Sequence, residues 1–229
     1  MKYFFTLLCS FLSYSMFSQN PENIIKLCEE VYKKTEFYQD SGRVFVEIYN
    51  TKIPSEKALY FKTSYSQSGL FSLEYYQSGH SNSLFTIVRD SNGKTKSWWG
   101  VTQKIDDKSE LSYILSGQHG VSSTVSTNIP NLLFSDKTLY YLFKTFEPTK
   151  PLEFEKINGE NCYKIYGKRF QSEEMTYWIS TSSLLVKRIF TDKPVADFRV
   201  RTTFNYSSFI PTGIPKNNFI FRPFRKVKL

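Results

Sequence analysis

The stretch FRVRTTFNY at residues 198–206, followed by SSFIPTGIPKNNFIFRP at residues 207–223, contains the pattern that decides the fold. Apolar and polar side chains alternate through the first stretch, which is typical of a β-strand with one buried face. In the second stretch Phe219 and Phe221 share one side of an extended segment that ends at Pro223. The sequence therefore predicts a short final strand there, at the closing edge of an aromatic-rich sheet.

The composition points in the same direction. Aromatic residues make up 17% of the 229 residues, with 21 Phe and 16 Tyr, and hydrophobic residues make up 40%. Aromatic and β-branched side chains favour half-buried pleated surfaces, and this hydrophobic content is enough for a sizeable core. A globular protein dominated by β-structure is expected.

Residues 1–18 have the pattern of a secretory signal peptide. Lys2 gives a short positive start, the uncharged apolar run 3–17 follows, and the small residue Ser18 precedes a cleavage point. The alternative is a membrane anchor, but the apolar run is short for a membrane span and a polar segment follows it. Lipidation at Cys9 is disfavoured because Leu8 is not small. The sequence predicts an exported mature protein, residues 19–229, that is soluble beyond the inner membrane.

The formal net charge of +9 suits anionic partners, although surplus surface lysine on a soluble protein is the preferred explanation. Nucleic acid is not expected, because no binding module and no run of more than two basic residues is present. Four basic residues in the tail 222–229 suit anionic membrane headgroups or, alternatively, a solvated terminus.

Cys28 and Cys162 remain after removal of the leader, and the sequence leaves open whether they form a disulfide or stay as buried thiols. His80 and His119 show no metal-ligand spacing with them, so neither a metal nor a cofactor is predicted. Catalytic sequence motifs are absent, and the acidic pairs are neighbours whose side chains diverge. These observations predict that the protein is not an enzyme.

A helix is predicted directly after the leader. Asn20 is a typical N-cap, Pro21 suits the first helical position, and an apolar stripe recurs between Ile24 and Tyr32. We expect this helix to reach about Phe37 and to end before the Asp-Ser-Gly sequence at 40–42.

Roughly ten strands are predicted from alternation and turn signals such as Asn92-Gly93 and Asn158-Gly159. Short connections imply an antiparallel meander. The region 107–147 lacks alternation and is predicted to be a helical insert between the two halves of the sheet. A single domain spanning 19–229 is expected. The ten predicted strands lie at residues 44–48, 58–65, 71–75, 84–88, 96–101, 152–157, 162–166, 175–179, 184–190 and 198–206.

Several segments, taken together and in this order, resemble the lipoprotein-carrier superfamily of Gram-negative bacteria, whose members are LolA- or LolB-like. The matching segments are 27–42, 117–123, 159–165, 177–188 and 214–223. The resemblance implies an α+β fold: a strongly curved antiparallel sheet forming an incomplete barrel, with the N-terminal helix and the helical insert as a lid. It also implies a periplasmic location and a cavity for acyl chains. Ser180 stands where the family usually has an aspartate, and we expect it to be a turn residue.

A curved sheet has a concave face that helices or a ligand must fill. Apolar side chains that share a strand face, with one member of the Trp98-Trp99 pair and Trp178, are candidates for a cavity wall, and the alternative for each is ordinary core packing. The wall candidates are Phe71, Leu73, Tyr75, Phe85, Ile87, Trp98, Trp178, Phe198, Val200 and Phe204. The lid candidates are Leu115, Val121, Leu132 and Leu133.

The resulting expectation is a monomeric carrier whose partner is an acyl chain, a lipid or a lipidated protein. The alternative is an envelope sensor or scaffold of the same fold that binds a protein partner. A burial gain of about 0.8 kcal/mol per methylene would let a single acyl chain bind without polar chemistry.

Overall fold

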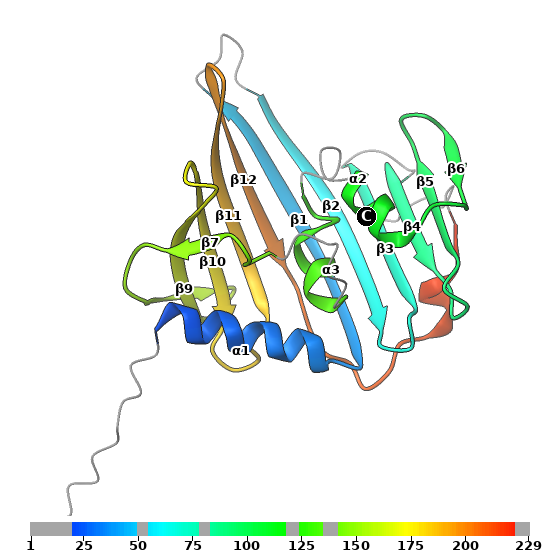
Figure 1. Cartoon of the computed structure of the whole chain (residues 1–229), viewed down its shortest axis with the longest axis horizontal. Helices are drawn as coiled ribbons and strands as arrows, with labels where there is room; N and C mark the ends of the chain where they lie inside the picture. Colours follow the sequence, from blue (N-terminus) through cyan, green and yellow to red (C-terminus); the bar gives the residue numbers. More distant parts are fainter. Residues whose placement is uncertain (1–19, 50–54, 78–82, 118–123, 135–141, 223–229) are drawn as a thin grey trace, which may run out of the picture.

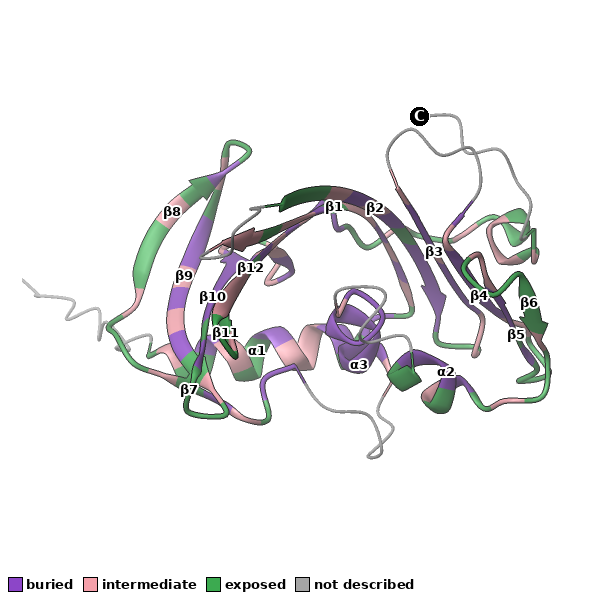
Figure 2. Ribbon diagram, turned by 90° about the horizontal axis from the view of Figure 1, so that it is seen from above, coloured by how far each residue is buried: buried purple, intermediate pink, exposed green. Residues whose placement is uncertain are grey.

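The computed structural model describes residues 20–49, 55–77, 83–117, 124–134 and 142–222. Its main feature is one antiparallel sheet of twelve strands in the order β6-β5-β4-β3-β2-β1-β12-β11-β10-β9-β7, with β8 also paired to β9 (Figure 1). The sheet is curved but not closed, and the helices lie inside the curve (Figure 2). This confirms the predicted incomplete barrel. The predicted leader lies outside the described residues.

The elements have the following bounds: α1 Pro21–Lys34, β1 Phe37–Tyr49, β2 Ser55–Ser66, β3 Phe71–Gln77, β4 Phe85–Arg89, β5 Thr95–Trp99, β6 Lys104–Asp106, α2 Leu111–Gly117, α3 Asn128–Leu133, β7 Phe146–Pro148, β8 Glu153–Ile157, β9 Glu160–Arg169, β10 Glu173–Ser180, β11 Val186–Val195, β12 Phe198–Tyr206 and the 3₁₀ helix η1 Lys216–Phe219.

All ten predicted strands are present, as β1–β5 and β8–β12. Two further strands, β6 and β7, have three residues each and form the two ends of the sheet order. Strands this short carry too little alternation to be recognised in a sequence. The predicted helical insert contains α2 and α3, and β7 begins at its end.

Helix α1 begins as predicted. The Asn20 side chain accepts a hydrogen bond from the Asn23 N–H at 2.8 Å, and Pro21 occupies the first turn. Ile24, Cys28 and Tyr32, spaced four residues apart, are buried against the sheet. In Figure 1 the helix lies across one end of the strands.

The end of α1 differs from the prediction. The helix stops at Lys34, and β1 starts at Phe37, so the sequence 40–42 lies within a strand rather than in a turn. Pairing with β2 explains the difference, because the register runs unbroken from Phe37 opposite Ser66. Gly42 is required in this strand, since a Cβ atom there would overlap the Asn205 carbonyl oxygen and the ring of Phe61.

The predicted final strand at Phe219–Pro223 is wrong. Residues 216–219 form η1, and Ile220 to Arg222 are outside any strand. The chain after β12 continues briefly beside β1, where Ser207 and Ser41 exchange backbone hydrogen bonds, and then packs η1 against β3. Alternating aromatics therefore mark a segment that covers a sheet face instead of pairing with its edge.

Candidate functional site

The concave face of the sheet is the place where a ligand site is expected. Side chains from its central strands form one hydrophobic cluster with the helices. Six wall candidates belong to this cluster and are fully buried, with 0% of their surface exposed. These six are Phe71, Leu73, Tyr75, Phe85, Ile87 and Phe204.

The helical insert fills the space in front of these residues. Leu115, Leu132 and Leu133, three of the lid candidates, are buried in the same cluster. The Phe134 ring, just after α3, meets the ring of Phe71 edge-on at 5.2 Å. The fourth lid candidate, Val121, lies outside the described residues. Wall and lid candidates thus pack directly together and act as protein core.

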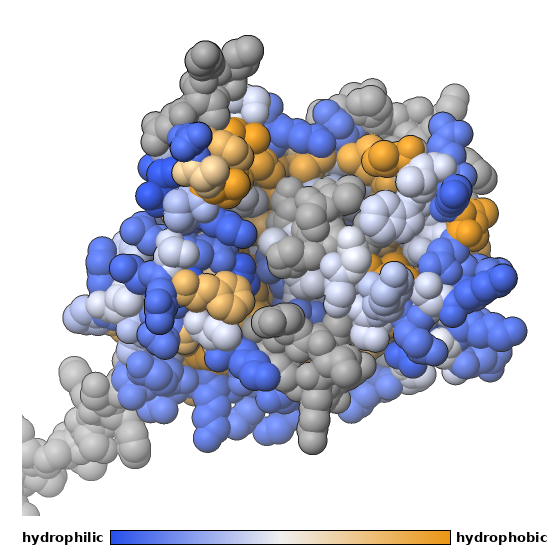
Figure 3. Space-filling model, turned by 45° about the horizontal axis from the view of Figure 1, so that its top comes forward, coloured by the Kyte–Doolittle hydropathy of each residue, from blue (hydrophilic) through white to orange (hydrophobic). Residues whose placement is uncertain are grey.

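The concave face continues past α3 towards the free ends of the long strands. Val46 and Ile48 of β1 and Phe198 and Val200 of β12 lie there, and all four are half-buried. Ile48 pairs with Val200 across the two strands. We call these four residues the open shelf. Figure 3 shows apolar atoms gathered at the upper left, over the free ends of these strands.

Phe198 and Val200 are thus the wall candidates that remain partly accessible. Val46 and Ile48 were not among the candidates, although they alternate with exposed Glu47 and with Tyr49. Their position opposite β12, which only the sheet order reveals, makes them part of the same surface.

Polar contacts run through the core on the concave side. Tyr38 donates a hydrogen bond to Asp40 at 2.8 Å, and the Val186 N–H donates to the Tyr32 hydroxyl at 3.1 Å. Burial raises the pKa of Asp40 to about 6, although hydrogen bonds from Thr63 and Tyr38 partly oppose the rise. These contacts tie α1 and β1 to the opposite half of the sheet through β11.

Trp98 and Trp178 require correction as wall candidates. The register aligns Trp99, not Trp98, with Phe85, and the rings of Phe85 and Trp99 meet at 5.7 Å. Trp178 belongs to a second, smaller cluster with Ile157 and Cys162. Adjacent strand residues face opposite sides of a sheet, and sequence alone does not tell which of two neighbours faces inwards.

The two cysteines are free and buried. Cys28 belongs to the concave cluster, whereas Cys162 belongs to the second cluster with Trp178. The sheet separates the two clusters, so the structure does not support the disulfide alternative.

In the part of the chain that the structure describes, no group of three or more His, Cys, Asp or Glu residues is placed to hold a metal ion. His80 and His119 fall outside that part. Ser180, expected to be a turn residue, is instead the last residue of β10, and its hydroxyl accepts the N–H groups of Ser182 and Ser183 in the turn that follows. Among the described helices, none combines the length and apolar character needed to span a bilayer.

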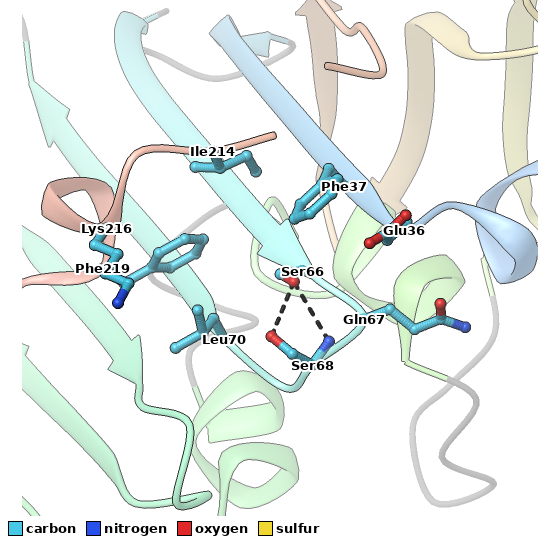
Figure 4. A pocket seen from close by; sticks show the side chains of 9 residues that line it. All are labelled: Glu36, Phe37, Ser66, Gln67, Ser68, Leu70, Ile214, Lys216 and Phe219. Atoms are coloured by element: carbon cyan, nitrogen blue, oxygen red, sulfur yellow. Dashed lines mark hydrogen bonds between the residues drawn. The ribbon is translucent and has the colours of Figure 1, made fainter. Parts of the chain in front are cut away.

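A surface pocket of about 420 Å³ lies where the start of β1, the β2–β3 turn and the C-terminal segment meet (Figure 4). Phe37, Ile214 and Phe219 contribute apolar surface, and the hydroxyl groups of Ser66 and Ser68 are 2.9 Å apart at its base. Residues Lys216 and Phe219 of η1 form one wall of the pocket. The pocket therefore exists because the C-terminal segment folds as η1 and not as the predicted strand.

No protein-family model matches the chain, and no curated protein matches it significantly. Solved structures do resemble it. A LolA-superfamily protein from Nitrosomonas europaea is 11% identical, with 88% of this chain and 98% of that chain covered and a TM-score of 0.38. A lipoprotein-sorting domain from Vibrio parahaemolyticus is 12% identical, covering 86% and 94%, with a TM-score of 0.35.

MucB is 8% identical, with 90% of this chain and 64% of that chain covered, and its TM-score is 0.51. MucB has also been solved in complex with MucA(peri). At these identities the likeness concerns the fold. What the comparison with MucB supports is a similar overall fold.

Proposed function

We propose that this protein is an exported, non-catalytic carrier that binds an acyl chain of a lipid or of a lipidated protein. The open shelf is the observation that supports the proposal most directly. Its four apolar side chains are half-buried and lead from the solvent to the fully packed core around Phe204. A hydrocarbon chain laid along the shelf would gain about 0.8 kcal/mol for each methylene that it buries.

Deeper binding requires the helical insert to move. Helices α2 and α3 have seven and six residues, and helices of this length have little stability of their own. Their attachment depends on burial of side chains such as Leu132 and Leu133. An acyl chain could take the place of Leu132 and Leu133 against Phe71 and Leu73. Because these wall residues would keep apolar contacts, displacing the helical insert by the ligand costs little hydrophobic free energy.

The test uses the chain without residues 1–18 and a fluorescent fatty acid. Ile48→Asn places an amide on the open shelf, and we expect affinity to fall about tenfold because the buried amide loses its hydration. Glu47→Asn is the matched control, since it changes the neighbouring residue on the opposite face of β1. It should leave the affinity unchanged. Native mass spectrometry of gently extracted protein should show bound lipid.

Equal affinities for Ile48→Asn and the unsubstituted chain would contradict the shelf as the binding site. Absence of both bound lipid and fatty-acid affinity would contradict the carrier function itself. Circular dichroism establishes that both variants remain folded, so that a loss of binding is not a loss of structure.

A scaffold that binds a protein partner is the second candidate. The close packing of Leu115, Leu132 and Leu133 favours it, because a filled interior is stable without a ligand. One stoichiometric envelope protein recovered with the native chain, together with no bound lipid, would establish this candidate over the carrier.

A further inference from the structure

The convex face of the sheet carries a row of side chains in register across six strands. Trp178 on β10 pairs with Arg188 on β11, which pairs with Asn205 on β12. Asn205 pairs with Arg43 on β1, and Arg43 pairs with Tyr60 on β2, which pairs with Tyr76 on β3. We call these six residues the outer row. In Figure 2 none of the described helices covers the convex side of β1, β11 or β12.

Two arginines of the outer row lack an acidic partner. No carboxylate of the described residues lies within ion-pair distance of Arg43 or Arg188. By contrast, two neighbouring cations on this face are paired: Arg199 and Arg201 both bind Asp192, at 2.9 and 3.0 Å. Arg43 and Arg188 are therefore not neutralised by a direct ion pair. The Glu155 carboxylate, which pairs with Lys164 at 2.6 Å, also feels the charge of Arg188.

The two arginines are held in position by neighbouring side chains. The Arg188 Nε donates to the Asn205 Oδ1 at 2.8 Å, and its guanidinium lies 5.5 Å from the Trp178 ring. The Arg43 guanidinium lies 4.0 Å from the centre of the Phe45 ring. Stacking on rings orients the planar guanidinium groups and leaves their N–H donors free for an anion.

Aromatic rings continue the row beyond Arg43. The Tyr60 and Tyr76 rings stack with a centroid separation of 5.6 Å and an interplanar angle of 12°. Tyr60, Phe45 and Phe190 are all half-buried, so part of each ring is accessible. Accessible rings beside amide and guanidinium donors suit a ligand that has both apolar ring faces and negatively charged oxygens.

The spacing of the outer row narrows the class of ligand. Trp178 and Tyr76, at the two ends of the row, are buried, and the four members between them are at least partly exposed. Neighbouring strands lie about 4.8 Å apart, so these four place one side chain at each such interval over a span of about 14 Å. This interval is close to the length of one pyranose unit along a polysaccharide. An extended peptide advances by only about 3.3–3.6 Å per residue, so its successive residues would not match the spacing of the side chains in the row.

We propose that the outer row binds an acidic polysaccharide, with Arg43 and Arg188 on its anionic groups, Asn205 on a hydroxyl group and Tyr60 against a sugar ring. The site is on the opposite face of the sheet from the open shelf. Binding of glycan therefore does not depend on binding of an acyl chain.

Polygalacturonate, a linear carboxylated polysaccharide, is the probe, and neutral dextran is its uncharged comparison. Binding is measured by isothermal titration calorimetry at low salt on the chain without residues 1–18. We expect polygalacturonate to bind and dextran not to bind. The double variant Arg43→Gln/Arg188→Gln should weaken binding at least about tenfold, because two charge-assisted contacts are lost.

Arg199→Gln/Arg201→Gln is the matched control, because it removes the same charge from the same face at residues that Asp192 already engages. It should weaken binding less than about threefold, as expected for long-range attraction alone. Arg43→Lys/Arg188→Lys retains the charge but not the planar fork, and binding should fall measurably. Ile48→Asn should bind polygalacturonate normally.

Equal weakening in the two glutamine double variants would overturn the proposal, since it would reduce the effect to net charge. Failure of polygalacturonate to bind would overturn it as well. So would binding of the protein to vesicles containing anionic phospholipid through Arg43 and Arg188 in place of polygalacturonate, because that result would identify the row as a membrane contact.

Discussion

Asp40 lies beneath α1 with 4% of its surface exposed, and the Tyr38 hydroxyl donates to it at 2.8 Å. A carboxyl group in this position stays protonated to a higher pH in the folded protein than in the unfolded chain, since burial raises its pKa to about 6 from 3.8. Polar groups with this degree of burial need complete hydrogen bonding, and Tyr38 provides part of it.

The raised pKa predicts a specific pH dependence. The contribution of Asp40 to stability is fully present below pH 3.8 and is lost as the pH rises through about 6, with a total change of about 3 kcal/mol. The free energy of unfolding of the unsubstituted chain, minus that of Asp40→Asn, should therefore fall between pH 4 and pH 6 and then level off. Urea denaturation at several pH values measures both quantities.

The subtraction removes the contributions of all other acids. Substitution of the exposed Asp107 by Asn is the control for loss of one carboxylate. A difference that stays level, or rises, across this pH range for Asp40→Asn would show that Asp40 is ionised at no cost in the folded protein.

Helix α1 illustrates what holds an element onto the sheet. Its buried stripe ends at Tyr32, whose hydroxyl accepts the N–H of Val186 from β11. The Tyr32 ring lies 5.3 Å from the Tyr38 ring, so one side chain joins the helix to both halves of the sheet. An isolated helix of 14 residues is marginal in water, and this attachment supplies stability that local propensity does not.

Tyr32→Phe should lower the free energy of unfolding by about 1–3 kcal/mol, because the buried Val186 N–H would lose its acceptor while the ring packing is kept. The substitution should also increase the rate of backbone amide hydrogen exchange, and this increase should be larger in α1 than in β2. Tyr113→Phe, at a residue of α2 that is 72% exposed, is the matched control and should change neither quantity. An unchanged melting temperature for Tyr32→Phe would mean that the hydrogen bond adds nothing.

The whole molecule is organised as one sheet with two different faces. Cys28 packs with the helices on the concave side, and Cys162 packs with Trp178 on the convex side. Burial raises the pKa of both thiols, so neither forms a thiolate readily near neutral pH.

A thiol reagent should therefore leave the native chain without residues 1–18 unmodified and should react with both cysteines in denaturant. Electrophoresis without reductant should show no shift on oxidation, because the sheet keeps the two sulfur atoms apart. Mass spectrometry of the intact protein distinguishes free thiols from a disulfide by the mass of two hydrogens. A loss of that mass in the native protein would refute the arrangement.

Most helices and strands of the half-barrel can be predicted from the sequence. The Asn20 cap and Pro21 set the start of α1, and alternation together with turn residues identified ten strands. The helices of the insert were recognisable from the loss of alternation. The short strands β6 and β7 were missed because three residues do not establish a period.

What the sequence determined by itself is the local period of each segment and, through the short connections, an antiparallel meander; the curvature was implied by the family resemblance. Only the tertiary structure decided which of Trp98 and Trp99 faces the core, that Val46 and Ile48 join Phe198 and Val200, and that Arg43 and Arg188 flank Asn205. It also decided that η1, which ends at Phe219, packs against β3 and that no edge strand forms there. The physical reason is that side-chain alternation fixes two faces of a strand, whereas the choice between the faces depends on partners distant in sequence.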